Sequence, residues 1–202
     1  MRNHEEIIKR LFKILCRYKE QPVALMEFLL KEMTGKYYPD RYSMYHQGDT
    51  VREAFYVSDG YVACLGFDEF DDKQVISIIG KDSIIAGKSF TAQEPSAYEW
   101  VCLPGAYVMR VSYVSMKEVY EKFPDAEELA RLVMADISDK ELERLKLLKR
   151  DAETVVYTFY VNHREFLDNP GMMADKELCT YLLISESTLR NVRQKLFKEG
   201  KL

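Results

Sequence analysis

Residues 173–198 read MADKELCTYLLISESTLRNVRQKLFK, and this stretch decides the fold of the C-terminal part. Two runs of apolar residues with helical spacing are separated by the short segment Leu183-Ile184-Ser185. Ser185 suits the N-cap of the second run, because its hydroxyl can accept a hydrogen bond from a free N–H of the first turn. The pattern predicts crossed helices over 173–182 and 186–197 that share a small core. The core positions are Leu178, Leu182, Ile184, Leu189, Val192 and Leu196.

The outer face of the second predicted helix carries residue types that read a DNA major groove. Short polar residues at a helix start come close to the bases, and Arg and Asn can make bidentate hydrogen bonds to guanine and adenine edges. A helical hairpin whose charged face is simply solvated is the alternative interpretation. We predict base contacts from Glu186, Ser187, Arg190 and Asn191, and phosphate contacts from Thr188, Arg193, Lys195 and Lys201.

The distribution of charge agrees with a DNA-binding C-terminal part. The 202-residue chain has a net charge of −4, but residues 176–202 carry six Lys and Arg against three Asp and Glu. This segment is therefore +3 and the remainder of the chain is −7. Basic charge gathered at one end of an acidic protein is the pattern expected of a small DNA-binding domain.

Upstream of this segment the spacing of the apolar residues changes. Helical spacing over 5–33, interrupted by Gln21-Pro22, predicts two amphipathic helices that stop at Thr34-Gly35. Short runs rich in Tyr, Val, Ile and Phe, separated by turns such as Ser58-Asp59-Gly60, predict an antiparallel sandwich or barrel over 37–111. Helices are expected again over 112–122, over a long charged stretch up to Arg150, and over 152–167.

The long charged helix has a stripe of apolar residues that we expect to cover one face. Symmetric pairing with a second copy of the chain would bury this stripe. Packing of the whole stripe against the helix's own sandwich is the alternative. The positions are Leu129, Leu132, Val133, Ile137, Leu142, Leu145 and Leu148.

The predicted fold class is α+β, with four segments. We expect N-terminal helices over 1–36, a sandwich domain over 37–122, a dimerisation helix over 123–150 and a DNA-binding domain over 151–202. The longest apolar runs fall short of the roughly 20 residues that a membrane span needs, so we expect a cytoplasmic protein without a membrane partner.

Metal chemistry and catalysis find no support in the residues. The cysteines and histidines are isolated along the chain, which predicts no zinc site and no iron–sulfur cluster. The sequence has no Ser/His/Asp or Cys/His set and no Gly-rich phosphate loop, so we do not expect an enzyme. The residues concerned are Cys16, Cys64, Cys102, Cys179, His4, His46 and His163.

The order of these segments resembles that of the Crp/Fnr superfamily of bacterial transcription regulators. Gln47-Gly48-Asp49, followed by AFYVSDG over 54–60, is similar to the strand-turn-strand of the family, and SESTLRNVR over 185–193 is similar to its recognition helix. The resemblance implies a cyclic-nucleotide-binding-like jelly roll, a long dimerisation helix and a winged helix-turn-helix.

The function implied by this resemblance is regulation of transcription. A homodimer would bind a pseudo-palindromic site on double-stranded DNA, with RNA polymerase as a further partner. A module that keeps the jelly roll but binds a ligand or a protein, without reading DNA, is the alternative.

Members of the superfamily that bind cyclic nucleotides carry a cassette in which a Glu holds the ribose and an Arg neutralises the phosphate. Here Lys88 stands in place of the Glu and Pro95 in place of the Arg. The resemblance therefore implies that cAMP is not the ligand, and no cofactor is predicted. The expected pocket consists of Gly87, Lys88, Ser89, Ser96 and Ala97, and its ligand stays open.

The helix-turn-helix departs from the family pattern at two positions. Leu183 stands where the turn usually has Gly, which costs steric energy if the backbone needs a positive φ there. Cys179 replaces a smaller residue on the first helix. A β-wing would have to lie before Pro170, although 154–161 reads better as the helix that precedes the reader than as strands.

Overall fold

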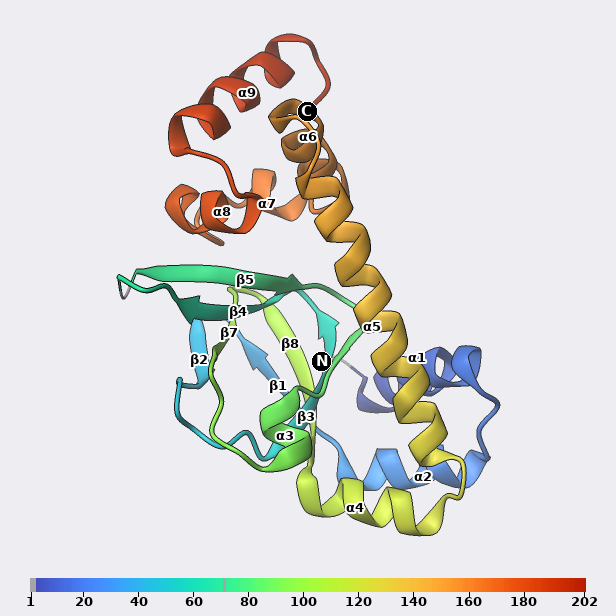
Figure 1. The fold of residues 1–202 in the computed structure, drawn as a ribbon. Coiled ribbons are helices and arrows are strands. Elements are labelled where there is room, and N and C mark those ends of the chain that lie inside the picture. The colour runs from blue at the N-terminus through green and yellow to red at the C-terminus, as the bar shows by residue number, and fades with distance from the viewer. Residues whose placement is uncertain (1–2, 71) are drawn as a thin grey trace.

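The computed structural model describes residues 3–70 and 72–202. N-terminal helices are followed by a two-sheet sandwich, a long helix and a C-terminal group of helices (Figure 1). The expected α+β class and order of segments are confirmed.

Two amphipathic helices begin the described chain, as predicted. Helix α1 (His4–Tyr18) starts at Asn3, whose side chain accepts a hydrogen bond from the N–H of Glu5 at 3.1 Å. Helix α2 (Val23–Glu32) follows Pro22 and ends directly ahead of a strand. The chain therefore enters the sandwich at Thr34, three residues earlier than expected.

The described strands form two four-stranded antiparallel sheets, in the orders β1-β8-β3-β6 and β2-β7-β4-β5. The predicted turn at Gly60 joins β3 to β4. Gly60 is required there because its φ is +70° and a Cβ would lie 2.8 Å from the Cα of Ala106. The elements are β1 (Thr34–Tyr38), β2 (Tyr42–Tyr45), β3 (Glu53–Asp59), β4 (Val62–Phe67), β5 (Lys73–Ile79), β6 (Ser83–Ile85), α3 (Lys88–Ala92), β7 (Glu99–Cys102) and β8 (Ala106–Ser112).

Helix α4 (Tyr113–Lys122) leads into the long helix α5 (Ala126–Leu148). The expectation that the apolar residues of the long helix share one face is wrong. Leu129 and Val133 are buried against the helix's own chain, whereas Leu142 and Leu145 are 53% and 44% exposed. Because each residue advances about 100° around a helix, the same stripe divides into an inner and an outer face.

The C-terminal part consists of α6 (Ala152–Asn162), α7 (Glu165–Asp168), α8 (Asp175–Leu182) and α9 (Glu186–Lys198). The single helix expected over 152–167 is wrong, because the backbone leaves the helical conformation at His163 (φ −134°, ψ 59°). The β-wing that the family resemblance implies is not found, whereas the helix favoured over 154–161 is confirmed, since these residues lie in α6. Residues 151–202, which are all described, contain no strand, and 163–174 form α7 and a turn instead.

The C-terminal helices share a hydrophobic core with one face of the β2-β7-β4-β5 sheet. The ring of Tyr61 packs against that of Phe166 with centroids 4.9 Å apart, and its hydroxyl donates to Glu165 at 2.7 Å. These helices are therefore packed on the sandwich, beyond their connection through α5. The sheet contributes Ala63, Leu65, Val75, Ile78 and Val101 to this core, and Leu103, directly after β7, adds to it.

Candidate nucleic-acid interface

Helices α8 and α9 form the predicted helix-turn-helix. Ser185 caps α9 as expected, since its Oγ accepts a hydrogen bond from the N–H of Thr188 at 3.1 Å. Leu189 and Leu196 are fully buried and fix α9 against α6 and α8. The turn between the two helices contains Leu183 with φ 54° and ψ 42°, so the left-handed conformation that usually requires Gly is present.

The residues predicted to read bases lie on the exposed side of α9. Glu186, Ser187, Arg190 and Asn191 are all exposed. Within the described part of the chain, the side chains of Arg190 and Asn191 have no hydrogen bond or ion pair. Both are therefore free to make bidentate contacts with base edges.

The residues predicted to contact phosphate are engaged within the protein. Arg193 donates to Asp175 at 2.7 Å, and its guanidinium lies over the ring of Tyr160, 5.5 Å from the centroid. The ammonium of Lys195 forms an ion pair with Glu153. The hydroxyl of Thr188 lies 2.8 Å from that of Ser185. Arg193 and Lys195 thus tie α9 to α8 and α6, a role that the sequence did not reveal because their partners belong to other helices.

The five residues of the expected ligand pocket do line one cavity, of about 520 Å³, inside the sandwich. The hydroxyl of Ser89 accepts from the N–H of Val51 at 2.9 Å and donates to the backbone oxygen of Glu94 at 2.6 Å. The hydroxyl of Ser96 donates to the backbone oxygen of Tyr98 at 2.8 Å. Both serines therefore hold the loop that forms the pocket wall.

The charged side chains that line this cavity are paired, and much of its wall is apolar. The ammonium of Lys88 is paired with Glu94 at 3.1 Å and its side chain is 84% exposed. Apolar side chains make up much of the wall. Sequence reasoning missed Glu53, which also lines the cavity and lies 3.5 Å from Arg110. The apolar residues are Val51, Phe55, Ile85, Phe90 and Trp100.

Solved structures share this architecture at low sequence identity. FixK2 from Bradyrhizobium japonicum has a TM-score of 0.64 and 14% identity, covering 83% of this chain and 86% of its own. The c-di-GMP responsive global regulator CLP of Xanthomonas campestris has a TM-score of 0.61 and 18% identity, covering 89% of this chain and 93% of its own.

The catabolite activator protein of Thermus thermophilus has a TM-score of 0.54 and 16% identity, covering 95% of this chain and 88% of its own. The chain has the Crp/Fnr fold. No protein-family model and no curated protein matches the sequence. At these identities the likeness extends to the fold, and the function has to be argued from the residues.

The Crp/Fnr fold of this chain shows neither a metal cluster nor a membrane helix in its described residues. No group of three or more His, Cys, Asp and Glu side chains there could hold a metal ion. No helix among them is long and apolar enough to cross a membrane. Burial raises the pKa of the Cys64 and Cys102 thiols to about 12, so both are unreactive thiols.

Proposed function

We propose that the protein is a Crp/Fnr-type transcription regulator that binds DNA through α9. The observation that carries the proposal is the pair Arg190 and Asn191, free and exposed on a capped helix of a helix-turn-helix. The positive charge of residues 176–202 supports it, since DNA binding neutralises phosphates. One of the solved structures with this fold, CLP, is a global regulator linked to virulence gene expression, which also supports it.

We propose that DNA binding requires a dimer formed along the outer face of α5. Leu132, Leu142 and Leu145 are 38%, 53% and 44% exposed on this face. A two-fold axis along paired α5 helices would place both C-terminal parts at the same end, because Figure 1 shows them beyond one end of α5. Two recognition helices at one end suit a pseudo-palindromic site.

We propose that cAMP is not the effector. The ribose-binding Glu and the phosphate-binding Arg of the family's cassette are Lys88 and Pro95 here. Lys88, the lysine that lines the cavity, is paired with Glu94 at 3.1 Å and its side chain is 84% exposed. A ligand held mainly by the apolar wall is compatible with the cavity.

Arg190→Ala and Asn191→Ala test the DNA-binding surface. Each variant should weaken binding to a duplex selected from random-sequence DNA by about 1–3 kcal/mol and relax base preference at one position. Adding cAMP should leave the affinity of the wild-type protein unchanged. Fluorescence anisotropy measures the affinity, and repeating the selection from random-sequence DNA with each variant measures the base preference.

The matched control is Arg52→Ala, because Arg52 is exposed and lies beside the start of α4, where its backbone oxygen accepts from the N–H of Tyr113. This control removes the same charge far from α9 and should keep base preference. Equal binding of the wild-type protein to all duplexes would favour the rival function, a ligand- or protein-binding module.

A further inference from the structure

We propose that the edge strand β5 is a latch that holds the helix-turn-helix in a closed position, and that DNA binding requires α8 to leave this strand. The inference rests on the proposed function and concerns how that site is regulated. Figure 1 shows α8 beside β5. The N–H of Val75 donates to Oγ1 of Thr180 at 2.9 Å, so α8 occupies the edge where a further strand would pair.

Two ion pairs hold the first turn of α8 to the sandwich. Arg41, between β1 and β2, donates to both carboxylate oxygens of Glu177 at 2.8 and 2.5 Å. Lys176 lies 3.8 Å from Asp72, which directly precedes β5. Burial alone would raise the pKa of Glu177, but the hydrogen bond and the charge of Arg41 outweigh burial and lower it. The carboxylate is therefore ionised in this contact.

Arg144 connects the latch to α5. Its guanidinium donates to the backbone oxygen of Ile76 in β5 at 3.1 Å and to that of Tyr181 in α8 at 3.3 Å. It also lies over the ring of Tyr181, 4.7 Å from the centroid. One side chain thus bridges three elements, so a displacement of α5 would disturb both sides of the latch.

The closed position conflicts with the use of a first helix in DNA binding. In a helix-turn-helix complex that helix crosses the DNA backbone, with phosphates close by. Here the first turn of α8 lies beside Asp72, at the end of the turn between β4 and β5, and the nearby cations Lys176 and Arg41 are already paired with Asp72 and Glu177. Negative charge beside the helix start repels phosphate, so the closed position disfavours DNA.

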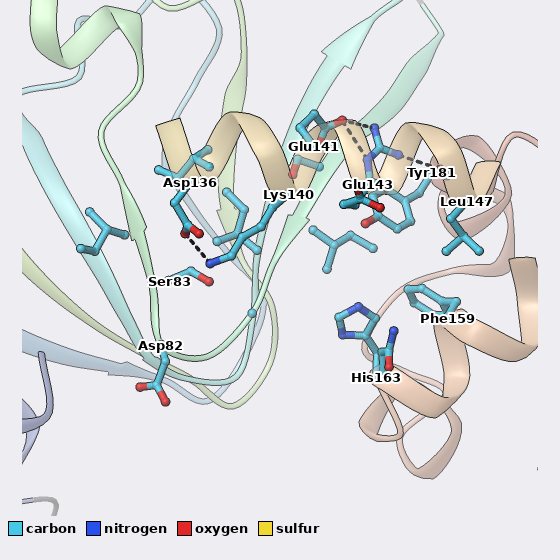
Figure 2. A pocket seen from close by; sticks show the side chains of 18 of the residues that line it. Asp82, Ser83, Asp136, Lys140, Glu141, Glu143, Leu147, Phe159, His163 and Tyr181 are labelled. Atoms are coloured by element: carbon cyan, nitrogen blue, oxygen red, sulfur yellow. Dashed lines mark hydrogen bonds and ion pairs between the residues drawn. The ribbon is translucent and has the colours of Figure 1, made fainter. Parts of the chain in front are cut away.

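The closed position leaves an open groove at the junction of the two parts. A cavity of about 490 Å³ lies between the sandwich, α5 and α6, where Asp136, Lys140, Phe159 and His163 line it (Figure 2). Its rim is charged and open to solvent, since the side chains of Lys140 and Glu143 are 69% and 71% exposed. Because solvent already reaches this junction, a second arrangement of the C-terminal helices uncovers less apolar surface than the opening of a fully packed interface.

Arg41→Ala tests the latch, because the two possible roles of Arg41 predict opposite changes in the affinity for DNA. If Arg41 latches α8, the variant should bind the selected duplex about fivefold or more tightly, although it has lost a positive charge. If Arg41 instead contacts phosphate, affinity falls and its dependence on salt becomes shallower, which overturns the latch. Unchanged affinity overturns it too. Arg52→Ala, which removes the same charge at the end of the sandwich near α4, is the control.

Hydrogen exchange at the Val75 amide reports the latch without DNA. Its exchange should accelerate in Arg41→Ala and in Thr180→Val, which removes the acceptor, while the amide of Val62 in the central strand β4 stays protected. Faster exchange at Val75 without tighter DNA binding overturns the latch. If no form of the protein selects a duplex, the proposed function is overturned, and exchange at Val75 shows separately whether Arg41 holds α8.

Discussion

Leu183 sits in the left-handed region with φ 54°, and its side chain is 72% exposed. The conformation costs a residue with a Cβ about 1–2 kcal/mol, and so exposed a side chain buries too little surface to offset this. Leu183→Gly should therefore raise the free energy of unfolding by about 0.5–1 kcal/mol, after the larger entropy of Gly in the unfolded chain is subtracted.

Leu183→Ala is the matched control for chemical denaturation of these variants. Alanine removes most of the side chain but keeps the Cβ, so it should show no such gain. Equal stability of the Gly and Ala variants would contradict the strain at this turn.

Single residues could be predicted where their role depends on near neighbours in the chain. The Ser185 cap and the exposure of Arg190 follow from spacing within one helix, and both are found as expected. The engagement of Arg193 depends on Asp175, eighteen positions away on another helix. Periodicity shows on which face of a helix a side chain lies, but it does not show which residue of another helix lies next to it. The predicted phosphate contacts therefore stay predictions.

At the scale of elements, the outer face of α5 carries the prediction of a dimer. Leu142→Glu combined with Leu145→Glu should give a monomer at micromolar concentration, because charge on a symmetric apolar seam faces its own copy. The fold should persist, since both side chains are already half-exposed in the single chain. Light scattering after gel filtration measures the mass, and a thermal melt checks the fold.

Leu129→Glu is the contrasting variant, because Leu129 is buried against the helix's own domain. It should unfold the protein through a buried, unpaired charge, by more than about 3 kcal/mol. A wild-type monomer, or a double variant that stays dimeric, would rule out the α5 seam.

The helices and strands could largely be predicted from the sequence, and the two errors in that prediction have physical causes. Two N-terminal helices, strands separated by turns and a long helix all follow from periodicity. The division of α5 into two faces was missed because its apolar residues are three, four or five positions apart, which fits one broad stripe or two. The break at His163 was missed because no Gly or Pro marks it.

At the scale of the whole molecule, the packing of the C-terminal helices on the sandwich left a signal in the sequence. Val62 to Leu65 in β4 form an unbroken apolar run, and all four residues are buried. A strand with one wet face alternates polar and apolar residues, so an unbroken run indicates that both faces are covered. The run does not say what covers the second face, and that had to come from the structure.

His163 lies at this junction and predicts how the docked molecule responds to acid. Its ring packs against those of Phe159, Phe166 and Tyr61, and the carboxylate of Glu165 is the charge that faces it. Burial lowers the pKa of His163 below 6.5, and the smaller effect of Glu165 does not cancel this. The unfolded chain therefore binds a proton at a higher pH than the folded chain does.

Stability should consequently fall as the pH drops below about 6.5, because the unfolded state then holds more protons. The melting temperature of the wild-type protein should decrease between about pH 7.5 and pH 5.5, and that of His163→Phe should decrease less, since its ring fills the same space without titrating. Glu165, whose pKa is lowered chiefly by the hydrogen bond from Tyr61, stays ionised through this range and is common to both proteins. An identical decrease in both would show that His163 does not control the junction.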